Sequence, residues 1–327
     1  MLKGQWDTSV GASPWRLALL PNGKVLISDW GDAQGGIYLF DPASPDSRSN
    51  FFAGTCNNAS GEWTYDGHVI GGSTPGMSVL GTGDDTRLYT FQEDYPSDYS
   101  LTMACYNIGT AEQITSVPDQ TFPNISAYMI NGNVDVIATP DWMVLSQVRG
   151  AGNNTKGVPS FMIAGYNDEV IFNSADLDLS GSDGAIALTD DRSRLYMMDC
   201  SDVIHAYDID LANAETPLKE AFTFKPSAAG EAYQMAFDHA GNLVIAGRSS
   251  FQAYTLPREA TETVTPAPAA QSIDGPMGIE DLDGENSDAD APAEYFNLQG
   301  VRVAGSALTP GIYIERRGSV ARKVIIR

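Results

Sequence analysis

Aromatic, acidic and guanidinium side chains recur where short apolar runs of this 327-residue chain begin or end. Aromatic rings stack on the apolar faces of sugars, and fixed polar groups beside them can bind hydroxyls, so the combination suits a glycan or protein ligand. The residues that we expect on one ligand-binding face are Trp15, Arg16, Trp30, Glu93, Arg149, Asp199, Tyr233 and Arg248. A competing interpretation packs both tryptophans inside the fold and leaves the charges as solvated loop residues.

A second set of side chains offers oxygen ligands at comparable positions. Glu231, Asn133 and Asp183 would suit a hard cation such as calcium if they converged. A calcium-assisted hydrolase of the gluconolactonase type needs such a Glu, Asn and Asp, and this is an alternative function. No other cofactor is expected.

The cysteines and histidines support other metal chemistry poorly. Cys56, Cys105 and Cys200 show no Cys-x-x-Cys spacing, and their odd number argues against zinc and against a disulfide framework. The three histidines are isolated in the sequence, with His68 expected in a loop and His205 in a strand. A metal site made of histidines is therefore not expected.

The elements that would position the candidate residues form a repeat. Two alternating apolar runs separated by a polar turn, followed by a third run, occur most clearly at 15–40 and again at 233–256. Equivalent first-strand positions are Leu17, Met77, Val136, Ile186 and Met235, with intervals of 60, 59, 50 and 49 residues. Short strands repeating at this period are typical of β-propeller blades, so an all-β propeller with five blades is predicted for residues 1–258.

Propeller geometry brings the loops that enter the first strands and leave the second strands to one face of the ring. The candidate residues occupy those loops, which is why a single ligand face is expected. Residues 3–10 could provide the fourth strand of blade five and close the ring. Alternatively, the chain is part of a propeller with further blades.

The charge is divided among three segments. Residues 1–258 hold 13 basic and 31 acidic residues, a net charge of −18, whereas 259–294 holds ten acidic and no basic residues. Residues 295–327 hold six basic residues and one acidic residue, a net charge of +5. Like charges and few apolar residues predict a disordered Pro/Ala-rich linker at 259–293, followed by a small β segment at 294–327.

The C-terminal segment carries YFNLQG at 295–300, PGIY at 310–313 and KVIIR at 323–327. In this order, the three elements resemble the C-terminal sorting domains that the type IX secretion system of the Bacteroidota recognises. The resemblance covers about a tenth of the chain. It implies a secreted or surface-displayed protein whose C-terminal segment has the secretion machinery as a partner, although the chain as given shows no signal peptide.

The stretch PNGKVLISDW at 21–30 resembles the repeat core of the NHL and YVTN propeller families. Only the first and last repeats carry this core well. The chain is thus similar to secreted Bacteroidota propellers that bear such C-terminal segments. Because propellers host many activities, this resemblance implies the fold and leaves the ligand open.

The net charge of −23 disfavours two kinds of partner. An acidic protein repels nucleic-acid phosphates, and no apolar run is long enough for membrane insertion. The leading expectation is a ligand-binding or interaction module for a glycan or an extracellular protein, with no catalytic residue assigned. The alternatives are the lactonase-like hydrolase and a structural propeller that spaces other domains of a larger surface protein.

Overall fold

The computed structural model describes most of the repeat region and parts of the C-terminal segment. The described residues are 14–29, 36–44, 48–51, 55–57, 62–65, 68–71, 76–93, 101–114, 117–130, 134–149, 158–177, 179, 181–227, 232–238, 240–247, 251–257, 263–267, 293–296, 302–303, 311–317 and 320–326. The chain divides into two compact units, Gly4–Ala267 and a smaller one of Met1–Lys3 with Pro268–Arg327. Each unit is described by itself.

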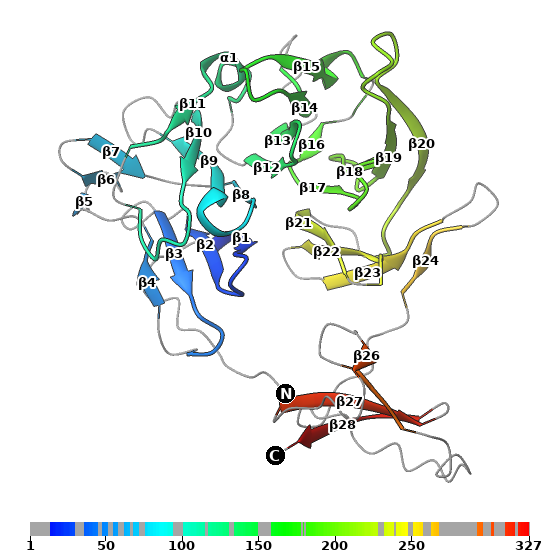
Figure 1. Ribbon diagram of the computed structural model, residues 1–327. Coiled ribbons are helices and arrows are strands. Elements are labelled where there is room, and N and C mark those ends of the chain that lie inside the picture. Colours follow the sequence, from blue (N-terminus) through cyan, green and yellow to red (C-terminus); the bar gives the residue numbers. More distant parts are fainter. Residues whose placement is uncertain are drawn as a thin grey trace. The chain divides into compact units, whose positions relative to one another are not determined.

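Unit Gly4–Ala267 is a five-bladed β-propeller, as predicted, and every blade is an antiparallel sheet with its first strand nearest the ring axis (Figure 1). Blade one contains β1 (Pro14–Leu19), β2 (Val25–Asp29), β3 (Gly36–Phe40) and β4 (Arg48–Asn50). Blade two contains β8 (Met77–Leu80), β9 (Arg87–Glu93), β10 (Leu101–Asn107) and β11 (Gln120–Thr121). Blade three contains β12 (Val134–Ala138), β13 (Met143–Arg149), β14 (Phe161–Ala164) and β15 (Val170–Asn173).

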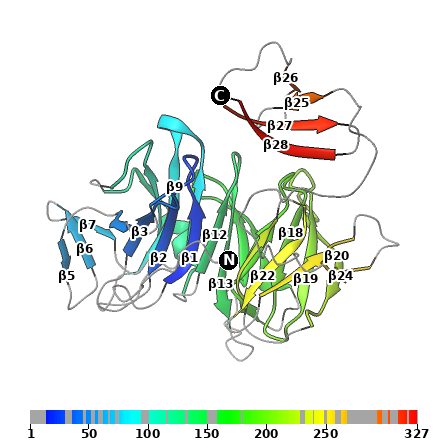
Figure 2. The ribbon, with the colours of Figure 1, turned by 90° about the horizontal axis from the view of Figure 1, so that it is seen from below.

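Blades four and five complete the ring. Blade four contains β17 (Ile186–Leu188), β18 (Arg194–Met198), β19 (Ile204–Ile209) and β20 (Leu218–Phe224). Blade five contains β21 (Ala232–Phe237), β22 (Leu243–Gly247), β23 (Phe251–Thr255) and β24 (Thr265–Pro266). All five first-strand positions that the sequence predicted lie in β1, β8, β12, β17 and β21. Figure 2, turned by 90°, shows β1 and β12 running along the ring axis.

The fourth strand of blade five differs from the expectation. The short strand β24 pairs with β23, with Tyr254 opposite Pro266 and Thr255 opposite Thr265, and takes the fourth place in this blade, while residues 3–10, which were expected there, lie outside the described residues. Proline cannot donate to a sheet ladder, and it is tolerated here because β24 is an edge strand. The blade therefore extends into the segment predicted as a linker, most of which lies outside the described residues.

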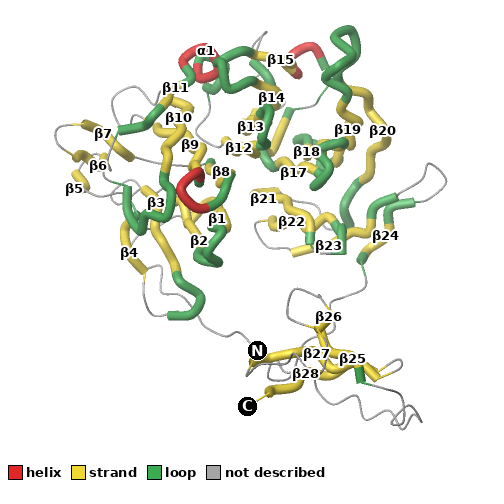
Figure 3. Tube along the Cα trace, viewed as in Figure 1, coloured by secondary structure: helices red, strands yellow, loops and turns green. Residues whose placement is uncertain are grey.

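Additional elements lie between the blades. A three-stranded sheet of β5 (Thr55–Asn57), β6 (Glu62–Tyr65) and β7 (His68–Gly71) separates β4 from β8, so His68 begins a strand and not a loop. The described helical elements are the one-turn helix α1 (Pro123–Ser126) and two 3₁₀ turns, η1 (Gly83–Asp85) and η2 (Ser174–Asp176). Figure 3 shows strands and loops almost throughout.

Four buried clusters hold neighbouring blades together. Alternate residues of a strand face opposite blades, so each sheet contributes one apolar face to each neighbour. The clusters include Leu26 with Leu88 between blades one and two, Phe91 with Val136 between two and three, Phe161 with Ile186 between three and four, and Tyr196 with Ile245 between four and five. Each such fully buried side chain contributes roughly 1.5–3 kcal/mol.

The C-terminal unit forms a separate sheet in the order β26-β25-β27-β28. Its strands are β25 (Glu294–Phe296), β26 (Arg302–Val303), β27 (Gly311–Arg317) and β28 (Val320–Ile326), one more strand than the sequence pattern indicates. Arg316 pairs with Glu294 across β27 and β25, and its guanidinium lies 5.2 Å from the ring centre of Phe296. Within the described residues, no helix has the length and apolar character required to span a membrane.

Candidate functional site

The predicted ligand-face positions that belong to the described strands lie at one end of the blades. Pairing of Pro14 with Asp29 and of Val134 with Gln147 places the starts of first strands beside the ends of second strands. We call this end the rim. The strand β16 (Ser182–Asp183) pairs with the end of β13, where Val148 lies opposite Asp183, so the backbones of two predicted residues, Arg149 and Asp183, are adjacent there.

The structure describes only part of the predicted set. The side chains of Trp15, Glu93, Arg149, Asp183 and Tyr233 lie outside the description, although their backbones belong to strands. Trp30, Asn133, Glu231 and Arg248 lie outside the described residues altogether. Their roles in ligand or calcium binding stay predictions, whereas Arg16 and Asp199 can be placed in full.

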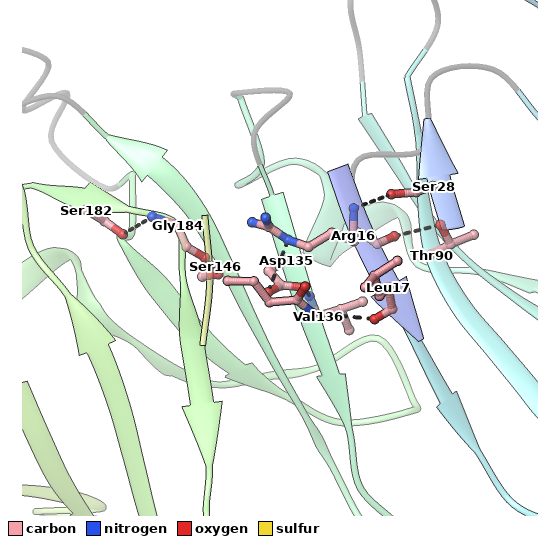
Figure 4. Close-up of polar contacts among 11 residues, drawn as sticks. Arg16, Leu17, Ser28, Thr90, Asp135, Val136, Ser146, Ser182 and Gly184 are labelled. Atoms are coloured by element: carbon pink, nitrogen blue, oxygen red, sulfur yellow. Dashed lines mark hydrogen bonds and ion pairs between the residues drawn. The ribbon is translucent and has the colours of Figure 1, made fainter. Parts of the chain in front are cut away.

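Arg16 forms an ion pair that joins two blades which are not neighbours in the ring. Its Nε lies 3.3 Å from Oδ2 of Asp135, so β1 of blade one is linked to β12 of blade three (Figure 4). Both residues are almost fully buried, with 1% of Arg16 and 5% of Asp135 exposed. A pair of charges removed from water in this way is costly, so its geometry must be held by other groups.

Backbone irregularity and hydrogen bonds hold the two partners. The register of β1 shifts between Pro14 and Leu17, and the Arg16 N–H donates to Ser28 Oγ at 2.9 Å. Such bulges redirect a side chain out of the regular pleat. Oδ1 of Asp135 accepts from the N–H of Val136 at 2.9 Å. Burial raises the pKa of the Asp135 carboxyl, while the charge of Arg16 acts in the opposite direction.

Blade two approaches the same place through a glycine. A Cβ on Gly76 would lie 2.9 Å from the Val134 carbonyl oxygen and 3.1 Å from the Cα of Asp135. Only a residue without a side chain allows the backbones to come this close. The Thr90 hydroxyl donates to the Gly76 carbonyl at 2.7 Å and fixes its position.

Buried hydroxyls extend this set of polar contacts into blades three and four. Ser146 of β13 donates to the carbonyl of Gly184 at 2.5 Å, and the Gly184 N–H donates to Ser182 Oγ at 2.9 Å (Figure 4). Both serines are fully buried. These bonds connect the segment that enters blade four with the second strand of blade three. The polar contacts of the rim thus extend over four blades.

Gln147, near the end of β13, faces inward. Its Nε2 donates to the carbonyls of Tyr128 and Pro159 at 3.0 and 2.8 Å, and its Oε1 accepts from the N–H of Ile130 at 2.9 Å. With both of its polar atoms engaged inside the fold, this amide supports the loop after α1 and is not directed toward solvent.

Asp199 is also engaged internally. Its Oδ1 accepts from the N–H groups of Ser201 and Val203 at 2.8 and 2.9 Å, and its Oδ2 lies 3.3 Å from Nε2 of His205. The other ring nitrogen of His205 lies 2.9 Å from Oε2 of Glu220. For this residue the structure favours a turn-stabilising role within the β18–β19 hairpin over direct ligand contact.

The described residues contain no group of three His, Cys, Asp or Glu side chains arranged to hold a metal ion. His205 shows why. Its two nitrogens contact carboxylates on opposite sides of the ring, so the three groups do not converge on one point. The side chains of the calcium set, Glu231, Asn133 and Asp183, are not among those that the structure describes.

The sequence pattern missed Asp135, the partner of Arg16. The available signal was a single carboxylate inside the otherwise apolar run Val134-Asp135-Val136-Ile137. A charge in such a strand is buried and therefore requires a partner. The identity of that partner depends on the curvature of the ring.

Comparison with known proteins shows the fold. No protein-family model and no curated protein sequence matches the chain. An oxidoreductase of Thermus thermophilus, named as a glucose dehydrogenase, shares 13% identity at a TM-score of 0.50, covering 79% of this chain and 85% of its own.

Two further solved structures are similar at lower scores. The PQQ-bound aldose sugar dehydrogenase of Streptomyces coelicolor shares 15% identity, with a TM-score of 0.48 and coverage of 78% and 81% of the two chains. A gluconolactonase of Xanthomonas campestris shares 10% identity, with a TM-score of 0.43 and coverage of 74% and 73%. At identities this low, the similarity to these solved structures bears on the fold alone.

Proposed function

We propose that this propeller is a binding module that takes a carbohydrate ligand at the rim. The observation that carries the proposal is the buried Arg16–Asp135 pair, which joins blades one and three at the strand ends that hold predicted ligand positions. In this proposal the pair positions the rim, and exposed groups of the neighbouring strand ends contact the ligand.

The first support is preorganisation. Ser28, Thr90, Ser146 and Ser182 are buried hydroxyls whose hydrogen bonds fix the strand ends around the ion pair. Groups held in advance lose less conformational freedom when a ligand binds, so a rigid rim favours affinity. Buried polar groups carry a desolvation cost, and their concentration at one end of the ring favours a role beyond packing.

The second support is the chemistry available at the strand ends. Arg149 and Asp183 belong to paired strands, and Trp15 directly precedes Arg16 in β1. A guanidinium supplies donors and a carboxylate supplies acceptors for sugar hydroxyls, while an indole ring covers an apolar sugar face. The proposed ligand contacts are the side chains of these three residues.

A glycan array followed by calorimetric titration of the best binder tests the proposal. Arg149→Ala should weaken binding at least tenfold, because a charged donor to the ligand is lost. Arg192→Ala is the matched control, since Arg192 pairs with Asp141 at the opposite end of the blades, in the turns between first and second strands. Melting temperatures show that both variants fold. Equal affinities of the two variants, or no glycan binding by the wild-type protein, would overturn the proposal.

A further inference from the structure

The imidazole ring of His205 lies between two carboxylates in blade four. Its Nδ1 is 2.9 Å from Oε2 of Glu220 in β20, and its Nε2 is 3.3 Å from Oδ2 of Asp199 in the turn after β18. The ring stacks on that of Tyr207, with the ring centres 6.1 Å apart and an interplanar angle of 8°. His205 therefore connects the turn 199–203, at the rim, with the outer strand of the blade.

An irregularity in β20 directs Glu220 toward this ring. His205 of β19 lies opposite Thr223 of β20. Regular antiparallel pairing would then place Ala221 opposite Tyr207, but the register shifts by one residue and Glu220 occupies that place. Alternate residues of a strand face opposite sides of a sheet, so the extra residue brings Glu220 to the side that carries both rings.

The two contacts require a proton on each ring nitrogen of His205. An ionised carboxylate only accepts hydrogen bonds, and a neutral imidazole has one N–H and one nitrogen that also only accepts. In the neutral ring, one nitrogen would turn its lone pair toward a negatively charged oxygen at hydrogen-bond distance. The observed geometry fits the imidazolium ion, which donates to Asp199 and Glu220 at once.

The other described groups around the ring leave this charge to the histidine. Burial and, to a smaller degree, the charges of the two carboxylates raise the pKa of the Tyr207 hydroxyl, which therefore stays neutral. The residue opposite the histidine on β18 is Met197, and Phe161 of blade three packs against Tyr207. Asp202 and Lys225, which also belong to the turn region, face each other, with Nζ 3.9 Å from Oδ2.

The two carboxylates differ in their freedom to move. Asp199 is fixed, because 7% of its side chain is exposed and its Oδ1 accepts from the N–H groups of Ser201 and Val203. Glu220 has 49% of its side chain exposed and can turn into water at little cost. When the ring gives up one proton, we therefore expect the other to stay on Nε2, facing Asp199, and the contact of Nδ1 with Glu220 to be lost.

We propose that His205 is a pH-sensitive link between the turn 199–203 and the outer strand β20. At low pH the imidazolium binds both carboxylates and holds the irregular part of β20. As the pH rises and Nδ1 loses its proton, Glu220 is released, while the hydrogen bond from Nε2 to Asp199 keeps the turn in place. Histidine is suited to this role because its charge changes between about pH 5 and about pH 8. The link is independent of the proposed carbohydrate ligand.

Nitrogen NMR of the imidazole rings tests the proposal on the full chain. The variant His205→Gln identifies the signals of this ring among the three histidines. In the wild-type protein both ring nitrogens of His205 should carry protons at about pH 5, and at about pH 8 only Nε2 should carry one. A ring that is neutral at the lower pH, keeps both protons at the higher pH or loses the proton from Nε2 would overturn the proposal.

Melting temperatures provide a second, independent test. Glu220→Gln removes the charge and keeps an oxygen that can accept from Nδ1. The wild-type protein should melt about 2 °C above this variant at the lower pH, and the difference should vanish at the higher pH. Glu215→Gln is the matched control, because it removes the same charge at an exposed position between β19 and β20. A difference for Glu220→Gln that does not change with pH, or an equal change for Glu215→Gln, would contradict the link.

Discussion

The Nε atom of Arg16 lies 3.3 Å from Oδ2 of Asp135, and through this pair the first strand of blade one is bound to the first strand of blade three. Gly76, at the start of blade two, also closely approaches the Asp135 backbone. Three blades therefore meet at one buried polar point. The stability of the rim depends on the balance between charge attraction and desolvation there.

Removing one partner of this pair should be strongly destabilising. Arg16→Met leaves the Asp135 carboxylate buried without its counter-charge, and we expect a loss of about 3–5 kcal/mol in the free energy of unfolding. Arg16→Met with Asp135→Leu should recover much of that loss, because no isolated charge remains. Urea unfolding of both variants measures the difference. If the free energy of unfolding of Arg16→Met lay within about 1 kcal/mol of the wild-type value, the expected cost of an unpaired buried charge would be contradicted.

The pair also predicts a pH dependence. Burial raises the native pKa of Asp135 above its unfolded value of about 4, so the native state holds the proton more tightly. The stabilisation from this proton is complete below the unfolded pKa and is lost as the pH rises through the native pKa. Relative to Asp135→Asn, the wild-type protein should therefore lose stability with rising pH in this window.

Thermal melts of the two proteins from about pH 3 to about pH 8, a range that brackets the ordinary carboxyl pKa, measure this difference. The substitution Asp135→Asn keeps the shape of the side chain and removes its titration, so other ionisable groups cancel in the comparison. A relative gain in wild-type stability with rising pH would mean that attraction to Arg16 outweighs desolvation.

The close approach of Gly76 to blade three should make this position sensitive to a single methyl group. Gly76→Ala places Cβ 2.9 Å from the Val134 carbonyl, and we expect a destabilisation of about 1–3 kcal/mol from strain. Gly23→Ala provides the comparison, since no atom lies within 4 Å of its Cβ and only its φ of +83° is unfavourable, at about 1–2 kcal/mol. Chemical denaturation of both variants tests whether contact of the new Cβ at position 76 with β12 lowers the free energy of unfolding further.

The sequence predicted the blades because each blade repeats a local pattern. Leu17 and Met235 could be aligned through their apolar alternation and their turns, and both lie in first strands as expected. The two-residue strand β24 escaped prediction because Thr265 and Pro266 carry little strand signal. Its pairing depends on the exposed edge of β23, which is a property of the folded blade.

The candidate site was less accessible to sequence reasoning. The end of each strand follows from the repeat, so the rim positions could be predicted, but the direction of a side chain could not. Arg16 and Asp199 were expected to face a ligand, but Arg16 is paired with the buried Asp135 and Asp199 accepts from backbone N–H groups of its own hairpin. The Arg16–Asp135 contact joins residues 119 positions apart in sequence, and only the closure of successive blades brings them together.

Asp199 should behave as a residue that stabilises the hairpin. Asp199→Ala removes the acceptor of two backbone N–H groups, from Ser201 and Val203, and should cost about 1–3 kcal/mol. Asp199→Asn keeps an acceptor oxygen at the same place and should cost less. Urea unfolding compares the two variants, and equal losses would show that the retained acceptor oxygen contributes little to stability.

The thiol of Cys105 should be unreactive in the folded protein. It is buried in β10, and burial raises its pKa, an effect that the Tyr89 hydroxyl and the Arg87 charge offset only in part. Both access and thiolate formation are therefore reduced. In a Cys56→Ser, Cys200→Ser background, labelling by a chromogenic disulfide at about pH 8, near the pKa of a free thiol, should proceed only as fast as the protein unfolds, and it should become rapid in urea. Labelling of the native protein at the rate of free cysteine would show that blades two and three separate locally around this residue.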